Sequence, residues 1–153
     1  MALRQARSKI HISCDLWTSP NSKAILGITA QFVNKAGKLT SLVLALKEVV
    51  GEHSGENMSK YLLHVIREYS IESNLGYIVM DNASDNDTLM TALSVSLRRE
   101  FKLSYDPIRH RIRCQGHIIN LAVKSFLFVT DKETIKEDKE ANIHLITLKE
   151  IEE

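Results

Sequence analysis

The chain has 153 residues and a formal net charge of +1 at pH 7, so it is long enough for one ordinary domain with its own hydrophobic core. Hydrophobic residues make up 44% and charged residues 25% of the sequence, a balance typical of globular proteins and unlike that of disordered ones. Two cysteines are too few for a disulfide framework, and no stretch approaches the roughly 18 apolar residues of a membrane helix, so we expect a reducing compartment and no membrane partner.

Three strands joined by short connections are predicted in the first third of the chain. Within residues 9–17, side chains alternate between two faces with the period of a half-buried strand. One face comprises Ile10, Ile12, Cys14 and Leu16, and the other comprises His11, Ser13, Asp15 and Trp17. Residues 24–33 and 39–50 are rich in β-branched and apolar residues, and residues 34–38 form a connection of hairpin length. This pattern predicts an antiparallel meander.

The periodicity then changes from that of strands to that of helices. After residues 51–57, apolar side chains recur at helical spacing and predict a first helix, at Tyr61, Leu62, Val65, Ile66 and Tyr69. Residues 76–81 form a short apolar strand that ends in Asp81, and Ser84 or Asp85 is expected to cap a second helix. The buried stripe of that helix is predicted at Leu89, Leu93, Leu97 and Phe101.

The last part of the chain is predicted to add one strand and one helix to the domain. Residues 111–114 form a short strand, and residues 115–128 form a largely buried helix. The resulting order β-β-β-α-β-α-β-α predicts an α/β fold, a mixed sheet with helices on its faces. We expect residues 1–130 to form this one domain and residues 131–153, with eight acids and four lysines, to form a charged helical tail.

Two aspartates are the strongest candidates for chemistry. Asp15 lies near the end of the first predicted strand, and Asp81 closes the fourth. If these strands are parallel neighbours, both carboxylates lie at the sheet end where open α/β sheets bind ligands. Such a pair suits Mg²⁺ or Mn²⁺, and two such ions about 4 Å apart support phosphoryl transfer. The alternative is that each aspartate is a capping or turn residue.

Basic residues are concentrated in residues 98–124, where seven lysines and arginines face two acids. A local basic stripe predicts a phosphate-binding surface, and the alternative is an ordinary solvated face. The candidate DNA contacts are Arg109, Arg111, Arg113 and Lys124.

Cys114 and His117 have the C-x₂-H spacing of half a zinc site. A structural zinc needs four ligands, and the sequence holds no second pair of this kind, so we do not expect zinc. One alternative is a buried cysteine beside a histidine at the start of a helix, each satisfied by hydrogen bonds. Another places His117 near the two carboxylates, where it donates to a phosphate oxygen.

Three sequence blocks together resemble the catalytic domain of hAT-type (hobo/Activator-like) transposases. They are DLWTS at 15–19, DNASDN at 81–86 and RCQGHIINL at 113–121, and HSGEN at 53–57 fits the same family. The resemblance covers roughly residues 10–130 and implies an RNase H-like fold. It also implies metal-dependent DNA strand cleavage and transfer in the nucleus, with transposon ends and target DNA as partners and homo-oligomerisation of the full-length protein.

The resemblance also assigns roles to individual residues. Asp15 and Asp81 correspond to the first two metal-binding acids of a D-D-E triad. Cys114 and His117 correspond to the C-x₂-H motif that shapes the active site, which makes His117 a catalytic candidate. The blocks also contain Trp17, Thr18 and Asn82, which are expected to support the site by packing.

The third acid of the family, a glutamate, follows a long helical insertion after the C-x₂-H block. The glutamates considered for this position do not match the motif; they are Glu133, Glu137, Glu140 and Glu150. We therefore expect a fragment of a transposase catalytic core that is inactive alone. One alternative is a relic or domesticated nucleic-acid-binding module without catalysis, and another is a small nuclease that recruits an acid of the tail as its third ligand.

Overall fold

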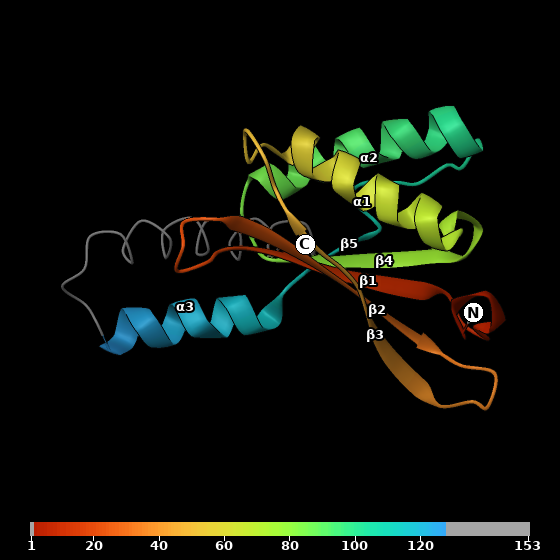
Figure 1. Cartoon of the computed structure of the whole chain (residues 1–153). Coiled ribbons are helices and arrows are strands. Elements are labelled where there is room, and N and C mark those ends of the chain that lie inside the picture. Colours follow the sequence, from red (N-terminus) through yellow and green to blue (C-terminus); the bar gives the residue numbers. More distant parts are fainter. Residues whose placement is uncertain (1, 128–153) are drawn as a thin grey trace, which may run out of the picture. The chain divides into compact units, whose positions relative to one another are not determined.

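A computed structural model describes residues 2–127 of the chain. The chain divides between Arg113 and Cys114 into two units, which are described over residues 2–113 and 114–127. The first unit contains five strands, two α-helices and two 3₁₀ helices, and the described part of the second contains one α-helix (Figure 1). In chain order, the elements of the first unit are η1 (Ala2–Gln5), β1 (Ile10–Thr18), β2 (Ala24–Val33), β3 (Leu39–Glu48), α1 (Gly55–Tyr69), η2 (Glu72–Asn74), β4 (Leu75–Met80), α2 (Asp85–Phe101) and β5 (Arg111–Arg113). The helix of the second unit is α3 (Gln115–Leu127). This is the predicted order of strands and helices.

The five strands form one mixed sheet in the order β3-β2-β1-β4-β5. The hairpin connections make β1, β2 and β3 an antiparallel meander, as predicted. β4 enters after α1 and lies parallel to β1, and β5 enters after α2 and lies parallel to β4. The sheet is therefore the α/β arrangement of an RNase H-like fold, with β1 and β4 as neighbours.

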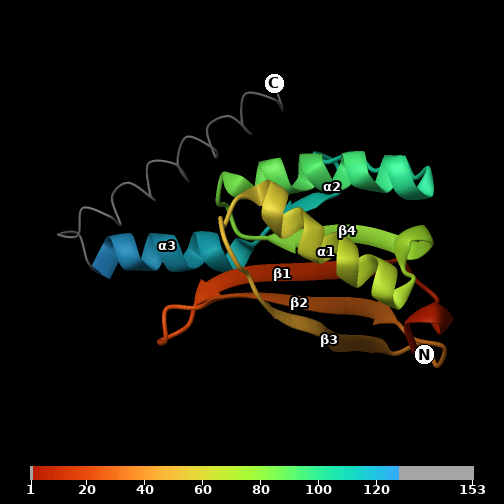
Figure 2. The same ribbon diagram turned by 45° about the horizontal axis from the view of Figure 1, so that its top comes forward.

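One face of the sheet is covered by α1 and α2, which lie on the same side (Figure 2). Every second residue of β2 from Ala24 to Phe32 is buried, as expected of a strand with one covered face. β1 alternates likewise. Ile10, Ile12 and Cys14 of its predicted apolar face are buried, and Leu16, the fourth residue of that face, is partly buried against the core. The predicted stripe of α2 is also confirmed, because Leu89, Leu93 and Leu97 are buried and Phe101 packs against the core.

The ends of the helices follow local hydrogen bonding. Ser54 caps α1 by accepting the Asn57 N–H on its Oγ at 3.4 Å. Ser70 ends α1 in the left-handed region, at φ 52°, and its N–H donates to the carbonyls of the last turn. Ser84 occupies the N-cap position of α2, as predicted, but its side chain makes no capping hydrogen bond.

The prediction that the last helix is largely buried is wrong. Leu121 is the one buried residue of α3, while Ile119, Val123 and Phe126 are exposed. The described part of this unit is a single helix, so no second layer is present within it to cover the apolar side chains. The predicted tail at residues 131–153 lies outside the described residues. Among those described, no helix has the length and hydropathy needed to cross a bilayer.

Candidate functional site

Asp15 and Asp81 lie at the same end of the sheet. Ser13 of β1 pairs with Val79 of β4. Asp15 lies two residues after Ser13, and Asp81 lies two residues after Val79. Both line one pocket of about 160 Å³. The parallel pairing of β1 with β4 thus confirms the arrangement on which the predicted carboxylate pair depends.

The Asp81 carboxylate is oriented by two donors on one oxygen. Its Oδ1 accepts the Ala83 N–H at 3.1 Å and the Asn86 side-chain amide at 2.5 Å. The bond to Ala83 is an Asx-turn, so Asp81 has the turn role that was the alternative at this position. Its Oδ2 makes no hydrogen bond with the described residues and remains available to a cation. The turn role and a metal role are therefore compatible.

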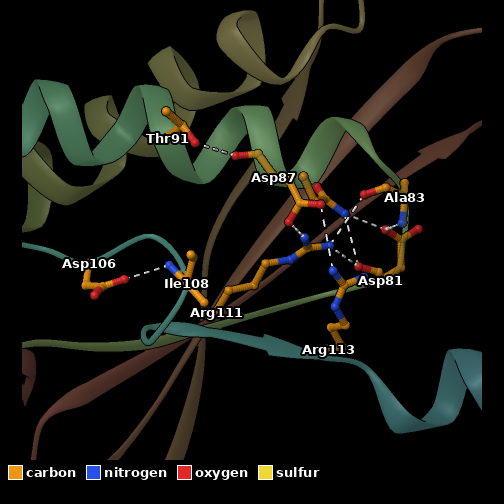
Figure 3. Close-up of polar contacts among 9 residues, drawn as sticks. Asp81, Ala83, Asp87, Thr91, Asp106, Ile108, Arg111 and Arg113 are labelled. Carbon is orange, nitrogen blue, oxygen red and sulfur yellow. Dashed lines mark hydrogen bonds and ion pairs between the residues drawn. The ribbon is translucent and has the colours of Figure 1, made fainter. Parts of the chain in front are cut away.

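Arg111 fastens the turn that carries Asp81. Its guanidinium reaches from β5 to the connection between β4 and α2 (Figure 3). Nη2 donates to the carbonyl oxygens of Asp81 at 3.0 Å and Ala83 at 3.4 Å, and Nη1 pairs with the Asp87 carboxylate. The side chain of Arg111 is only 4% exposed, whereas that of Asp87 is 64% exposed. These contacts favour a positioning role for Arg111, and its contact with DNA stays a prediction.

Arg113, two residues further along β5, lies close to the same carboxylate. Its Nη2 is 3.7 Å from Oδ2 of Asp87, and 29% of its side chain is exposed. Burial, followed by the charge of Arg111, lowers the pKa of Arg113. Two guanidinium groups thus share one carboxylate, which leaves Arg113 the better placed of the two for an anion from solvent.

Cys14 reports the electrostatic character of the pocket. Burial, followed by the charges of the Asp15 and Asp81 carboxylates, raises the pKa of its thiol to about 12. The charge of Arg111 opposes this shift. Two carboxylates thus act on one buried group, and the pocket that they line favours a cation over an anion.

The remaining predicted site residues of the first unit lie around the pocket rather than in it. Trp17 is 42% exposed, and an added Cβ at Gly27 would lie 2.8 Å from its ring. Gly27 therefore leaves room for the indole to lie over β2. Thr18 is exposed at the end of β1, and the side-chain oxygen of Asn82 is buried without a hydrogen-bond partner among the described residues.

The C-x₂-H residues belong to the second unit. Cys114 and His117 are both half-buried at the start of α3, where the His117 N–H donates to the Cys114 carbonyl at 3.1 Å. Lys124 is exposed on the same helix. Their predicted roles beside the carboxylates stay predictions.

The basic segment is contiguous in sequence but divided in the structure. Arg98, Arg99 and Lys102 lie at the end of α2, whereas Asp85 and Asn86 at its start line the pocket. A helix of 17 residues is about 25 Å long, so these cations lie far from the carboxylates. Arg109 lies on the exposed connection before β5, where its Nε is 3.7 Å from Asp106. The first unit therefore does not present these residues as one stripe.

The sequence alone assigns no role to His53, and in the structure this residue lines the pocket. The signal that pointed to it was the HSGEN block, which stands directly before α1. Among residues 2–127, no three histidine, cysteine, aspartate or glutamate side chains are grouped closely enough to hold one metal ion.

Comparison with known proteins identifies the family. Residues 13–108 match the model of the ZBED1 RNase-like domain. The chain belongs to this family. It is a hAT-type transposase-related domain, as the sequence blocks predicted.

Its relatives are much longer proteins. The chain is 32% identical over 120 residues to the "Putative transcriptional regulator tpeD" of Talaromyces stipitatus, covering 78% of this chain and 14% of the relative. It is 27% identical over 128 residues to the "Putative AC transposase" of Zea mays, covering 83% and 16%. It is 22% identical over 120 residues to the "Zinc finger BED domain-containing protein RICESLEEPER 1" of Oryza sativa, covering 78% and 17%. The chain thus spans about one sixth of the relatives it matches, and no solved structure matches it.

Proposed function

We propose that this chain is part of a hAT-type transposase catalytic core whose Asp15 and Asp81 bind Mg²⁺ or Mn²⁺. The observation that carries the proposal is the pair of carboxylates at the ends of two parallel strands, lining one pocket. Hard oxygen donors and the free Oδ2 of Asp81 fit these ions. When bound, such ions supply stabilisation of the attacking and leaving oxygens in phosphoryl transfer.

The residues of the chain have distinct tasks in this proposal. Asn86 and the Ala83 N–H hold the Asp81 carboxylate in one orientation, and Arg111 holds the turn beneath it. Phosphates of transposon ends and target DNA, in the nucleus, are contacted by cations, for which we propose the exposed Arg109 and Lys124 and the partly buried Arg113. Cys114 and His117 support the site, and the full-length protein acts as a homo-oligomer.

Turnover of DNA needs more than the residues described. Two-metal phosphoryl transfer requires further carboxylates beyond a pair, and residues 2–127 bring no three potential ligands together. The four candidate glutamates from Glu133 to Glu150 lie outside the described residues. We therefore expect this chain to bind the metal ion and DNA, with strand cleavage and transfer confined to the complete protein.

The test is titration of Mn²⁺ into the wild type and the variants Asp15→Asn and Asp81→Asn. Calorimetry gives the affinity, and quenching of Trp17, the one tryptophan of the sequence, reports binding near β1. We expect each variant to weaken binding about tenfold or more, since each loses a charged ligand of the ion. Glu68→Gln, an exposed carboxylate on α1, is the control that leaves the affinity unchanged.

Equal Mn²⁺ affinity in the wild type and both aspartate variants contradicts the proposal. The second candidate function, a nucleic-acid-binding module without catalysis, rests on the exposed cation Arg109, whose side chain is 86% exposed. Salt-sensitive DNA binding that is the same in Mn²⁺ and in EDTA supports this second function instead.

A further inference from the structure

A third segment of the chain reaches the pocket between the two aspartates. His53 lines the same pocket as Asp15 and Asp81, although it lies on the connection between β3 and α1 and on neither of their strands. Its side chain is exposed and makes no hydrogen bond with the described residues. Both ring nitrogens are therefore available to a ligand in the pocket.

The backbone around His53 is held in place by its neighbours. The side-chain amide of Asn57 donates to the carbonyl oxygens of Val50 at 3.2 Å and Glu52 at 2.9 Å. Ser54 starts α1 directly after His53 and caps it. These bonds tie the connection to the first turn of the helix, so the histidine is presented from a fixed backbone.

Gly55 joins this segment to the turn that carries Asp81. An added Cβ at Gly55 would lie 2.1 Å from the carbonyl oxygen of Asp85 and 2.5 Å from the nitrogen of Leu89. The first turns of α1 and α2 are thus in backbone contact. Asn86, in the first turn of α2, donates a hydrogen bond to the Asp81 carboxylate. The contact between the two helices therefore holds the His53 segment and the Asp81 carboxylate in fixed relative positions.

A histidine in this position has two chemical options, ligation of the metal ion or donation of a hydrogen bond to an anion. The first is disfavoured, because no three potential ligands among residues 2–127 are close enough to share one ion. The second adds a hydrogen-bond donor to a pocket whose charged lining groups are the carboxylates of Asp15, Asp81 and Asp85, which attract the metal ion and repel a phosphate. The amide of Asn86 is committed to Asp81, which leaves the ring N–H of His53 to receive an anion.

We propose that His53 is a substrate-contacting residue that donates a hydrogen bond to a phosphate oxygen of DNA at the Asp15–Asp81 pocket. The inference rests on the proposed function and adds a third position to that site. Phosphate contacts from a side chain on a fixed backbone position the strand without selecting its sequence. His53 therefore affects the affinity for DNA and leaves the affinity for the metal ion to the aspartates.

The experiment compares His53→Ala and His53→Gln with the control His64→Ala, an exposed histidine on α1. Calorimetry gives the Mn²⁺ affinity, and fluorescence anisotropy gives the affinity for a short DNA duplex at low salt, in Mn²⁺ and in EDTA. We expect His53→Ala to weaken DNA binding in Mn²⁺ about tenfold or more, the effect of losing one hydrogen bond to a charged group. His53→Gln keeps an N–H donor and restores part of this loss, and His64→Ala changes neither affinity.

Several results overturn the inference. The first is DNA affinity in His53→Ala equal to that of the wild type or of His64→Ala. The second is a loss of Mn²⁺ affinity in His53→Ala as large as that in Asp81→Asn, which makes His53 a metal ligand. A wild type that binds no DNA overturns it too. A wild type that binds DNA but no Mn²⁺ refutes the proposed metal site, and the His53→Ala and His64→Ala comparison in EDTA then still decides the role of His53.

Discussion

Substitution of Gly55 by alanine tests whether the contact between α1 and α2 holds the pocket together. The new methyl group meets the Asp85 carbonyl oxygen at 2.1 Å, the Leu89 nitrogen at 2.5 Å and the Thr88 Cβ at 2.9 Å. Two of these are backbone atoms, so a rotamer change cannot relieve the clash. Since ordinary contact begins at 3.4 Å, the two first turns must separate by about 1 Å.

The size of the effect follows from two opposing contributions. Overpacking of a tight contact destabilises a fold by about 1–3 kcal/mol, and more when backbone must move. Alanine is favoured over glycine within a helix by at most about 1 kcal/mol, and by less at the first helical position. We therefore expect Gly55→Ala to lower the free energy of unfolding by about 1–3 kcal/mol. Movement of the α2 turn also displaces Asn86, so Mn²⁺ affinity falls as well.

Urea unfolding followed by Trp17 fluorescence measures this effect in the first unit, and the Mn²⁺ titration measures its consequence for the pocket. Gly116→Ala is the control, because its Cβ at the start of α3 meets only Cys114 Sγ at an ordinary 3.7 Å. Unfolding of Gly55→Ala at the same urea concentration as the wild type, or a higher one, refutes the argument. A loss of stability with unchanged Mn²⁺ affinity refutes the link between the helix contact and the pocket.

Three further predictions concern buried groups. Asp87→Asn is expected to destabilise the protein by about 2–3 kcal/mol, because it leaves the buried guanidinium of Arg111 without its carboxylate. Arg111→Met is expected to cost less, about 1–2 kcal/mol, because the Asp87 carboxylate that it leaves behind is exposed and stays hydrated. Urea unfolding of both variants checks this order, and the reverse order contradicts it. The pKa of Cys14, about 12 when folded against an ordinary 9.0, means that the unfolded chain loses this proton first, so stability falls above pH 9.0 by at most about 1.4 kcal/mol per pH unit. Unfolding at pH 8 to 10 tests this, with Cys14→Ala as the variant that removes the Cys14 contribution, and at pH 8 a thiol reagent should modify Cys114 and spare Cys14 in the native protein.

The sequence by itself determined the type and order of the elements. The two-residue alternation at Ile10, Ile12 and Cys14 reflects the pleat of a strand, and the four-residue spacing at Leu89, Leu93 and Leu97 reflects the turn of a helix. These periods depend only on the backbone of one segment, so a strand or a helix can be recognised without knowing what the segment packs against. The same holds for the aspartates at the strand ends and for the sequence blocks that carried the family resemblance.

Only the tertiary structure decided which side chains meet. The segments with Asp15 and Asp81 are separated by the meander and α1, and pairing of β1 with β4 brings both carboxylates to one pocket. Charge counting treated Arg111 as a surface cation, yet contacts from β5 to the α2 turn bury it. His53 lies at the pocket because the first turn of α1, which follows it, packs against the first turn of α2. Burial and contact depend on packing between segments distant in sequence, and local periodicity carries no information about those partners.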